Sequence, residues 1–159
     1  MGAGLGYSVA SQHEGRKAVI VVGDGAAQMT IQEISTMIRY RQPVLMIVVD
    51  NEGYQIEEVL HKGPYNFIAN WPFHALAKAF VSTTDKGAED FTVSMLVKTE
   101  TELVQAFKQV EERPNRFYLL HCKIGAEDVS KKLLEFGASM MKSLFVFSLH
   151  LTLCAQPCG

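Results

Sequence analysis

Two short turns in this sequence carry the residue types that hold a metal ion and a phosphate. The first is Gly23-Asp24-Gly25-Ala26, in which the glycines let the backbone approach a ligand closely and Asp24 offers an anionic oxygen. The second is Asp50-Asn51-Glu52-Gly53, in which Asn51 offers an amide oxygen and Gly53 a backbone carbonyl. Mg²⁺ commonly takes a few such protein oxygens and completes its octahedron with water and substrate phosphates.

Each turn follows a short apolar run, which predicts where the turn lies. The runs 17–22 and 44–49 are rich in valine and isoleucine, and they end at the two turns. In open α/β sheets ligands bind at the carboxyl edge of the strands, so we expect both turns at that edge. A helix that begins soon after Gly25 would direct its free N–H groups and its positive dipole end at a phosphate. The two turns together therefore predict a Mg²⁺-diphosphate site.

Strands and helices alternate along the rest of the chain. Further strands are predicted over 93–97 and 117–124. Thr30 and Glu33 match a capping box for a helix over 30–40, whose apolar face carries Ile31, Ile34, Met37 and Ile38. Other helices are predicted over 54–60, 73–80, 100–112 and 127–141, the helix over 100–112 with Leu103, Phe107 and Val110 on its apolar side. The alternation predicts a single α/β domain, a parallel sheet with helices on both faces.

The residues around the two turns resemble the thiamine-diphosphate-dependent 2-oxo acid decarboxylases. The segment GDGAAQMTIQEISTMIRYRQPVLMIVVDNEGYQIEEVLHKGPYNFIANWPF is similar to the pyruvate decarboxylase group, including its indolepyruvate-type members. QEISTMIR, GYxIE and GPYNxIxNW are more particular than the general GDG…N cofactor motif. The resemblance runs from about Gly2 to Met141. It implies a thiamine diphosphate- and Mg²⁺-binding domain over 1–142, the C-terminal domain of a decarboxylase, followed by a divergent tail over 143–159.

The resemblance also implies a role for each residue of the two turns. Asp24 and Asn51 would bind Mg²⁺ through their side chains, and Gly53 would bind it through its carbonyl. The Gly23–Ala26 turn would hold the diphosphate through the backbone N–H groups of Gly25 and Ala26. The family often has Ser in place of Ala26, so one hydroxyl contact is absent, and commonly Asn in place of Asp50, so this chain adds a negative charge near the metal.

Three residues after the second turn match the family word GYxIE. By resemblance Glu57 lies over the thiazolium ring in a partly dry pocket and takes part in proton transfer after decarboxylation. Tyr54 and Ile56 would line the cofactor and substrate pocket. The competing interpretation of Glu57 is a solvated helix residue like its neighbour Glu58, since only the family position separates the two.

The implied reaction is the non-oxidative decarboxylation of a 2-oxo acid, pyruvate giving acetaldehyde and CO₂. The family's aminopyrimidine-binding domain, with its activating glutamate and catalytic histidines, has no counterpart here, so we expect the isolated chain to be inactive or nearly so. In the family that domain comes from a second subunit, which implies a full-length partner and a homo-oligomeric parent enzyme. Three alternatives stay open: a non-catalytic module that binds cofactor or pairs with a full-length relative, an indolepyruvate- or phenylpyruvate-type decarboxylase, and a generic nucleotide-binding domain.

Composition excludes several other classes of function. The formal net charge is −2 and the basic residues are scattered, so neither nucleic acid nor an anionic membrane is an expected partner. Cys122, Cys154 and Cys158 form neither a disulfide framework nor a zinc pattern, and we interpret them as reduced thiols of a cytoplasmic protein. The five histidines show no ligand spacing, and His61 and His74 are expected at the surface or in loops. An exposed sheet face where a partner domain belongs predicts self-association.

Overall fold

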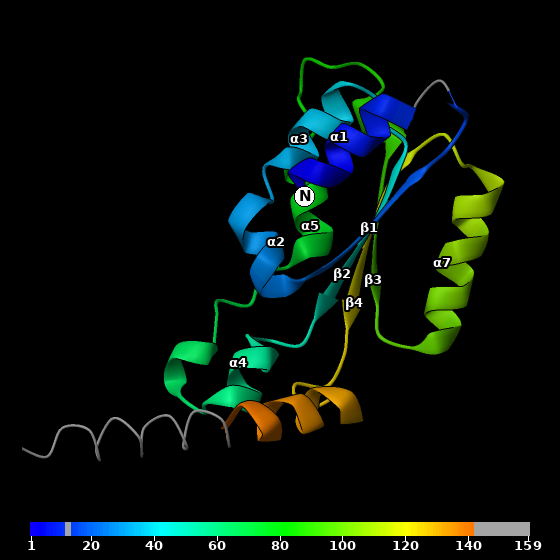
Figure 1. Ribbon diagram of the computed structural model, residues 1–159. Helices are drawn as coiled ribbons and strands as arrows, with labels where there is room; N and C mark the ends of the chain where they lie inside the picture. Colours follow the sequence, from blue (N-terminus) through cyan, green and yellow to red (C-terminus); the bar gives the residue numbers. More distant parts are fainter. Residues whose placement is uncertain (12–13, 142–159) are drawn as a thin grey trace, which may run out of the picture.

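A four-stranded parallel sheet forms the centre of the protein (Figure 1). The computed structural model describes residues 1–11 and 14–141 of the 159-residue chain. The strand order is β1-β2-β4-β3, and every neighbouring pair is parallel. The strands are β1 Ala18–Gly23, β2 Val44–Asp50, β3 Thr92–Val97 and β4 Phe117–Lys123. This arrangement confirms the predicted α/β class and parallel sheet.

Helices cover both faces of this sheet, as predicted. In Figure 1, α1, α2, α3 and α5 lie against one face and α7 lies against the other. The helices are α1 Gly2–Ser11, α2 Asp24–Thr30, α3 Glu33–Arg39, α4 Gln55–Leu60, α5 Phe73–Ala79, α6 Ala88–Phe91 and α7 Glu100–Glu112. A 3₁₀ turn, η2, spans Pro64–Asn66, and residues 131–141 are also helical.

The two layers bury two separate apolar clusters. The larger one lies between the sheet and α3 and α5, and the predicted apolar face of the 30–40 segment is buried in it. The smaller one joins α7, through Ala106 and Val110, to β2, β3 and β4. β2 contributes alternate residues to both clusters, because it is a central strand covered on both faces. This burial holds the carboxyl ends of β1 and β2 side by side.

Three local predictions were wrong. The helix predicted over 30–40 begins only at Glu33, as α3, because Thr30 is the last residue of α2; Gln32 is the N-cap residue of α3, and no side-chain cap bond forms there. The capping box occurs instead at α7, where Thr99 accepts from the backbone N–H of Glu102 at 3.2 Å and Glu102 accepts from that of Thr99 at 3.0 Å. Phe107, placed on the apolar side of α7, is 38% exposed. Helix α1 was not predicted, and its glycines have a low intrinsic helix propensity.

The described residues leave one part of the sheet uncovered. Val19 and Val21 of β1 are 59% and 64% exposed, because α7 covers the same face only over the other strands. Among the described residues no helix combines the length and the apolar character that a membrane span requires. Cys122 is a free thiol and half-buried. The predictions made for the tail over 143–159 and for His13, Cys154, Cys158 and His150 lie outside the described residues.

Candidate metal and diphosphate site

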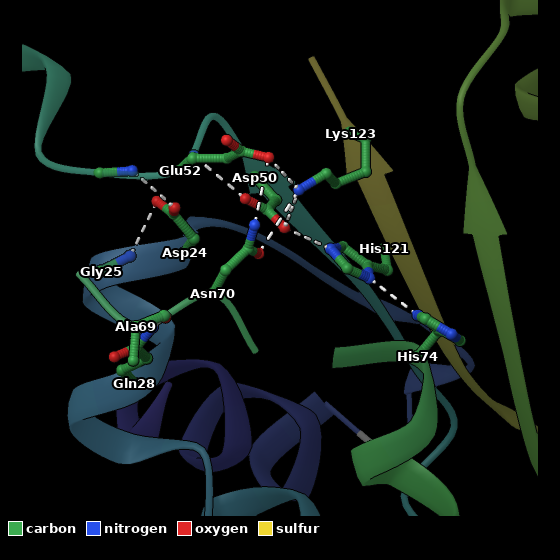
Figure 2. A network of polar contacts seen from close by, with 11 residues as sticks. Asp24, Gly25, Gln28, Asp50, Glu52, Ala69, Asn70, His74, His121 and Lys123 are labelled. Atoms are coloured by element: carbon green, nitrogen blue, oxygen red, sulfur yellow. Dashed lines mark hydrogen bonds and ion pairs between the residues drawn. The ribbon is translucent and has the colours of Figure 1, made fainter. Parts of the chain in front are cut away.

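The carboxylate of Asp24 joins the two predicted turns. Asp24 begins α2 directly after β1, and its side chain is 3% exposed. Its Oδ2 accepts a hydrogen bond from the backbone N–H of Gly53 at 3.0 Å, across 29 positions of sequence. This contact is possible because β1 and β2 are neighbours in register, with Gly23 opposite Val49, so that both strands end at one edge. The structure therefore brings the first turn against the second (Figure 2).

The second turn has a strained backbone, which hydrogen bonds hold on both sides. Glu52 has a φ of +67°, which non-glycine residues rarely adopt, and its N–H donates to Asp50 Oδ1 at 3.1 Å. Gly53 needs its small size, because a Cβ there would lie 2.8 Å from the carbonyl oxygen of Asn66. Tyr54 N–H donates to that same carbonyl at 2.8 Å. These contacts give Asn51 and Gly53 one defined position beside Asp24.

Two buried carboxylates, those of Asp24 and Asp50, lie at the edge of the sheet where β1 and β2 end. Burial raises the pKa of Asp24, the neighbouring Asp50 raises it further, and the N–H groups of Gly25 and Gly53 oppose the rise. Burial would also raise the pKa of Asp50, but bonds from His121, Glu52 and Lys123 outweigh it and the pKa lies below its usual value. A divalent cation bound at Asp24 would relieve the cost of keeping that carboxyl ionised. The donor set, one carboxylate, one amide and one carbonyl, fits Mg²⁺.

The backbone around Gly25 is closely covered. Gly25 lies in the first turn of α2, and its N–H donates to Asp24 Oδ1 at 2.9 Å. A Cβ at position 25 would run into the ring of Tyr54, so only glycine fits beneath that ring. Ala26 follows it and is exposed. Tyr54, predicted to line the cofactor pocket, thus lies directly over the Gly23–Ala26 turn.

A small pocket of about 100 Å³ opens beside the second turn. It is lined by three of the predicted site residues, Asn51, Gly53 and Tyr54, together with Gln55, Glu58 and Phe67. Within the described part of the chain, the side-chain amide of Asn51 makes no hydrogen bond, so its oxygen is available to a ligand. The predicted role of Asn51 as a metal ligand stays a prediction.

The helix after the turn places Glu57 and Glu58 differently from the expectation. Glu57 is an exposed residue in the first turn of α4, and Ile56 is 48% exposed, so the described residues do not form the partly dry pocket expected around Glu57. Glu58, which the sequence suggested was merely solvated, accepts from Asn66 Nδ2 at 2.6 Å and from the backbone N–H of Gly63 at 3.3 Å. Glu58 thereby fixes the loop that follows α4.

Sequence reasoning missed a buried chain of polar side chains beneath the site. His121 Nε2 lies 2.6 Å from Asp50 Oδ2, and His121 Nδ1 lies 3.0 Å from Nδ1 of His74 (Figure 2). Burial, followed by nearby His121 and Lys98, lowers the pKa of His74. A signal was present in the sequence, because alternation along β4 puts Phe117, Leu119, His121 and Lys123 on one face. A histidine on that apolar face requires a polar partner.

Lys123 of β4 and the loop after α4 also reach the site. Lys123 Nζ contacts Glu52 Oε1 at 2.8 Å and Asp50 Oδ2 at 3.2 Å, and Asn70 Nδ2 donates to Glu52 Oε1 at 3.1 Å. Gln28 of α2 donates to the carbonyl of Ala69 at 2.6 Å. Figure 2 shows these contacts spanning α2, the second turn and the loop. The loop thus closes one side of the site.

Comparison with known proteins places the chain among cofactor-binding domains. Residues 1–122 match the family described as thiamine pyrophosphate enzyme, C-terminal TPP binding domain; thiamine pyrophosphate is thiamine diphosphate. Pyruvate decarboxylase of Neurospora crassa is 36% identical over 135 residues, which is 85% of this chain and 22% of that enzyme. Pyruvate decarboxylase 2 of Arabidopsis thaliana is 37% identical over 139 residues, 87% of this chain and 22% of that enzyme. The chain therefore spans less than a quarter of the length of these relatives.

A solved structure shows the same fold. Benzoylformate decarboxylase from Polynucleobacter necessarius superposes with a TM-score of 0.66 over 79% of this chain and 23% of that one, at 22% sequence identity. At this identity the likeness concerns the fold alone. The family match over residues 1–122, together with a sheet edge that joins the two motif turns, shows that the chain belongs to the C-terminal TPP-binding domain family of thiamine pyrophosphate enzymes.

Proposed function

We propose that this chain supplies the diphosphate- and Mg²⁺-binding half-site of a thiamine-diphosphate-dependent 2-oxo acid decarboxylase, with pyruvate as its substrate. The observation that carries the proposal is the contact between Asp24 and Gly53, because it brings the metal-binding residue types of both turns to one point. The curated relatives support the reaction class, since those reported above are pyruvate decarboxylases.

In this proposal Asp24, Asn51 and Gly53 hold Mg²⁺ through three oxygens, and the metal in turn holds the diphosphate. The Gly23–Ala26 turn lies against the diphosphate with its backbone N–H groups. Because Gly25 N–H now donates to Asp24 Oδ1, that bond has to be exchanged for one to a phosphate oxygen when the cofactor binds. The exchange replaces one charged acceptor with another, so it costs little.

The cofactor's thiazolium ring, when bound, supplies the electron sink for the decarboxylation. Glu57 gives and takes a proton at its carboxyl oxygens beside that ring, and Ile56 contributes an apolar wall that excludes water. Both side chains are exposed in this chain, so the dry surroundings that such chemistry needs come from the aminopyrimidine-binding domain of a full-length subunit. The 159-residue chain alone is therefore expected to bind the cofactor with little or no turnover. The parent enzyme is expected to be a homo-oligomer.

A second candidate is a non-catalytic module that pairs with a full-length relative. The exposed β1 face favours it, because Val19 and Val21 offer an apolar surface that pairing would bury. An indolepyruvate- or phenylpyruvate-type substrate is the alternative within the first proposal. Side chains outside this chain would select among these 2-oxo acids, so substrate choice is tested in the parent enzyme with each acid in turn.

The test is calorimetric titration of the purified chain with thiamine diphosphate, with and without Mg²⁺. Binding is expected only with Mg²⁺, and Asp24→Ala is expected to weaken it at least about 100-fold, because it removes a direct metal ligand. Asp90→Ala is the matched control, since it removes a carboxylate from α6 at the opposite edge of the sheet. If a chain shown to be folded by circular dichroism binds no cofactor, the half-site does not work alone. The pairing module then becomes the better account.

A further inference from the structure

The hydrogen-bonded chain of buried Asp50, buried His121 and half-buried His74 has no part in the chemistry proposed so far. Asp50 is 1% exposed and His121 is 3% exposed, on the face of the sheet that packs against α5 (Figure 2). Burying such groups costs free energy unless their hydrogen bonds are made, and here every described polar atom of the Asp50 side chain has a partner. A fully paired buried group of this kind holds a defined geometry.

Both oxygens of Asp50 are held by donors from different elements. Oδ1 accepts from the backbone N–H of Glu52, and Oδ2 accepts from Lys123 Nζ and lies 2.6 Å from His121 Nε2. Because an ionised carboxylate only accepts, His121 Nε2 carries the hydrogen of that contact. With all its bonds committed, Asp50 cannot swing toward a cation bound at Asp24.

His74 of α5 continues the hydrogen-bonded chain beyond His121. The rings of His74 and His121 stack with centroids 5.3 Å apart and an angle of 22°, and a single hydrogen joins their Nδ1 atoms at 3.0 Å. Phe73 packs edge-on against the other side of His121, at 5.3 Å and 80°. The imidazole of His121 is therefore fixed in rotation by two side chains of α5, and its Nε2 faces Asp50.

The Asp50 carboxylate holds the backbone of Glu52, whose N–H donates to Asp50 Oδ1. The left-handed φ of Glu52 is costly for a residue with a Cβ and persists only where surrounding contacts enforce it. We propose that Asp50 and His121 are positioning residues, whose hydrogen bond orients the Asp50 carboxylate to hold Glu52 N–H and so fixes the turn that carries Asn51 and Gly53. The identity of that turn as the metal-binding turn rests on the proposed function, whereas its geometry does not.

The test combines backbone amide exchange, followed by nuclear magnetic resonance on the cofactor-free chain, with the titration described above. Asp50→Leu cannot accept from Glu52 and is expected to lower the protection of that amide about tenfold, with a similar loss of Mg²⁺-dependent cofactor affinity. Asp50→Asn keeps an acceptor oxygen and is expected to restore both to within about threefold. His121→Phe keeps the ring packing but loses the bond to Asp50, and is expected to fall between them. It also serves if Asp50→Leu does not fold.

Val48→Ala is the matched control, because it removes buried apolar volume from the same strand and leaves the turn untouched. It is expected to lower the melting temperature without lowering Glu52 protection or cofactor affinity. Wild-type protection of Glu52 in Asp50→Leu or His121→Phe would overturn the inference, as would an equal loss in Val48→Ala. If the exchange results are as expected but the wild-type chain binds no cofactor, the proposed function fails and the positioning role stands. If the wild type binds the cofactor and Asp50→Leu binds it equally well, the positioning role fails alone.

Discussion

At the scale of single residues, the site holds two buried carboxylates, those of Asp24 and Asp50. Asp50 lies close enough to raise the pKa of Asp24, whereas the pKa of Asp50 itself is lowered. Asp50 has cationic and N–H donors around it, whereas Asp24 has only two backbone N–H groups to oppose burial. Among the described residues, Asp24 is thus the carboxylate without a positive partner. That difference supports the proposed metal-binding role of Asp24 and the proposed holding role of Asp50.

His74 gives a residue-scale prediction about pH. Its folded-state pKa is lowered from 6.5, so below pH 6.5 the unfolded chain gains a proton that the folded chain does not. The free energy of unfolding is therefore expected to fall as the pH drops from 7.5 to 5.5, and His74→Gln is expected to flatten that slope. Urea melts of both proteins across this range measure it.

Lys78→Gln on the same helix is the control, because a lysine does not titrate in this range and the slope is expected to stay. Equal slopes in the wild type and His74→Gln would show that His74 does not drive the dependence.

At the scale of elements, a capping box stabilises the N-terminus of helix α7. Its N-cap Thr99 and Glu102 satisfy each other's backbone N–H groups, and the 13-residue helix carries Ala106 and Val110 into the second apolar cluster. Thr99→Ala is expected to lower the free energy of unfolding by about 1 kcal/mol. Thr30→Ala is the paired comparison, because the same residue pattern makes no cap bond there, and it is expected to change stability by less than about 0.5 kcal/mol. Chemical denaturation of both variants checks this, and a larger loss at Thr30 would contradict it.

The capping-box patterns at Thr30 and Thr99, of which only the second forms a cap, illustrate which elements the sequence could predict. The four strands were predictable because the runs around Val48 or Leu120 are apolar on both faces, and turn residues end them. The positions of Asp24 and Asn51 directly after β1 and β2 were predictable for the same reason, and their roles at the site stay predictions. The break between α2 and α3 was not, because Thr30 and Glu33 spell a cap whose use depends on the backbone around Gln32. The chain from Asp50 to His74 needed the strand order, since β4 follows β2 in space but not in sequence.

At the scale of the whole molecule, the two faces of the sheet are unequally covered. Several helices bury one face, whereas on the other face α7 reaches only part of the sheet (Figure 1). β1 is an edge strand, and its side chains Val19 and Val21 stay exposed beside a free row of backbone groups. Exposed apolar edge strands pair with other chains unless charge or bulk prevents it.

This surface leads to a prediction about association. The purified chain is expected to be larger than a monomer by light scattering, with a mass that rises with concentration, because association buries Val19 and Val21. Val21→Lys puts a charge on the edge strand and is expected to shift the population toward monomer. Val9→Lys makes the same change at an exposed position of α1 and is expected to leave the mass unchanged, which separates the sheet face from a general effect of charge. A wild-type chain that stays monomeric at every concentration would mean that β1 is covered or repelled without a partner, and would remove the main support for the pairing module.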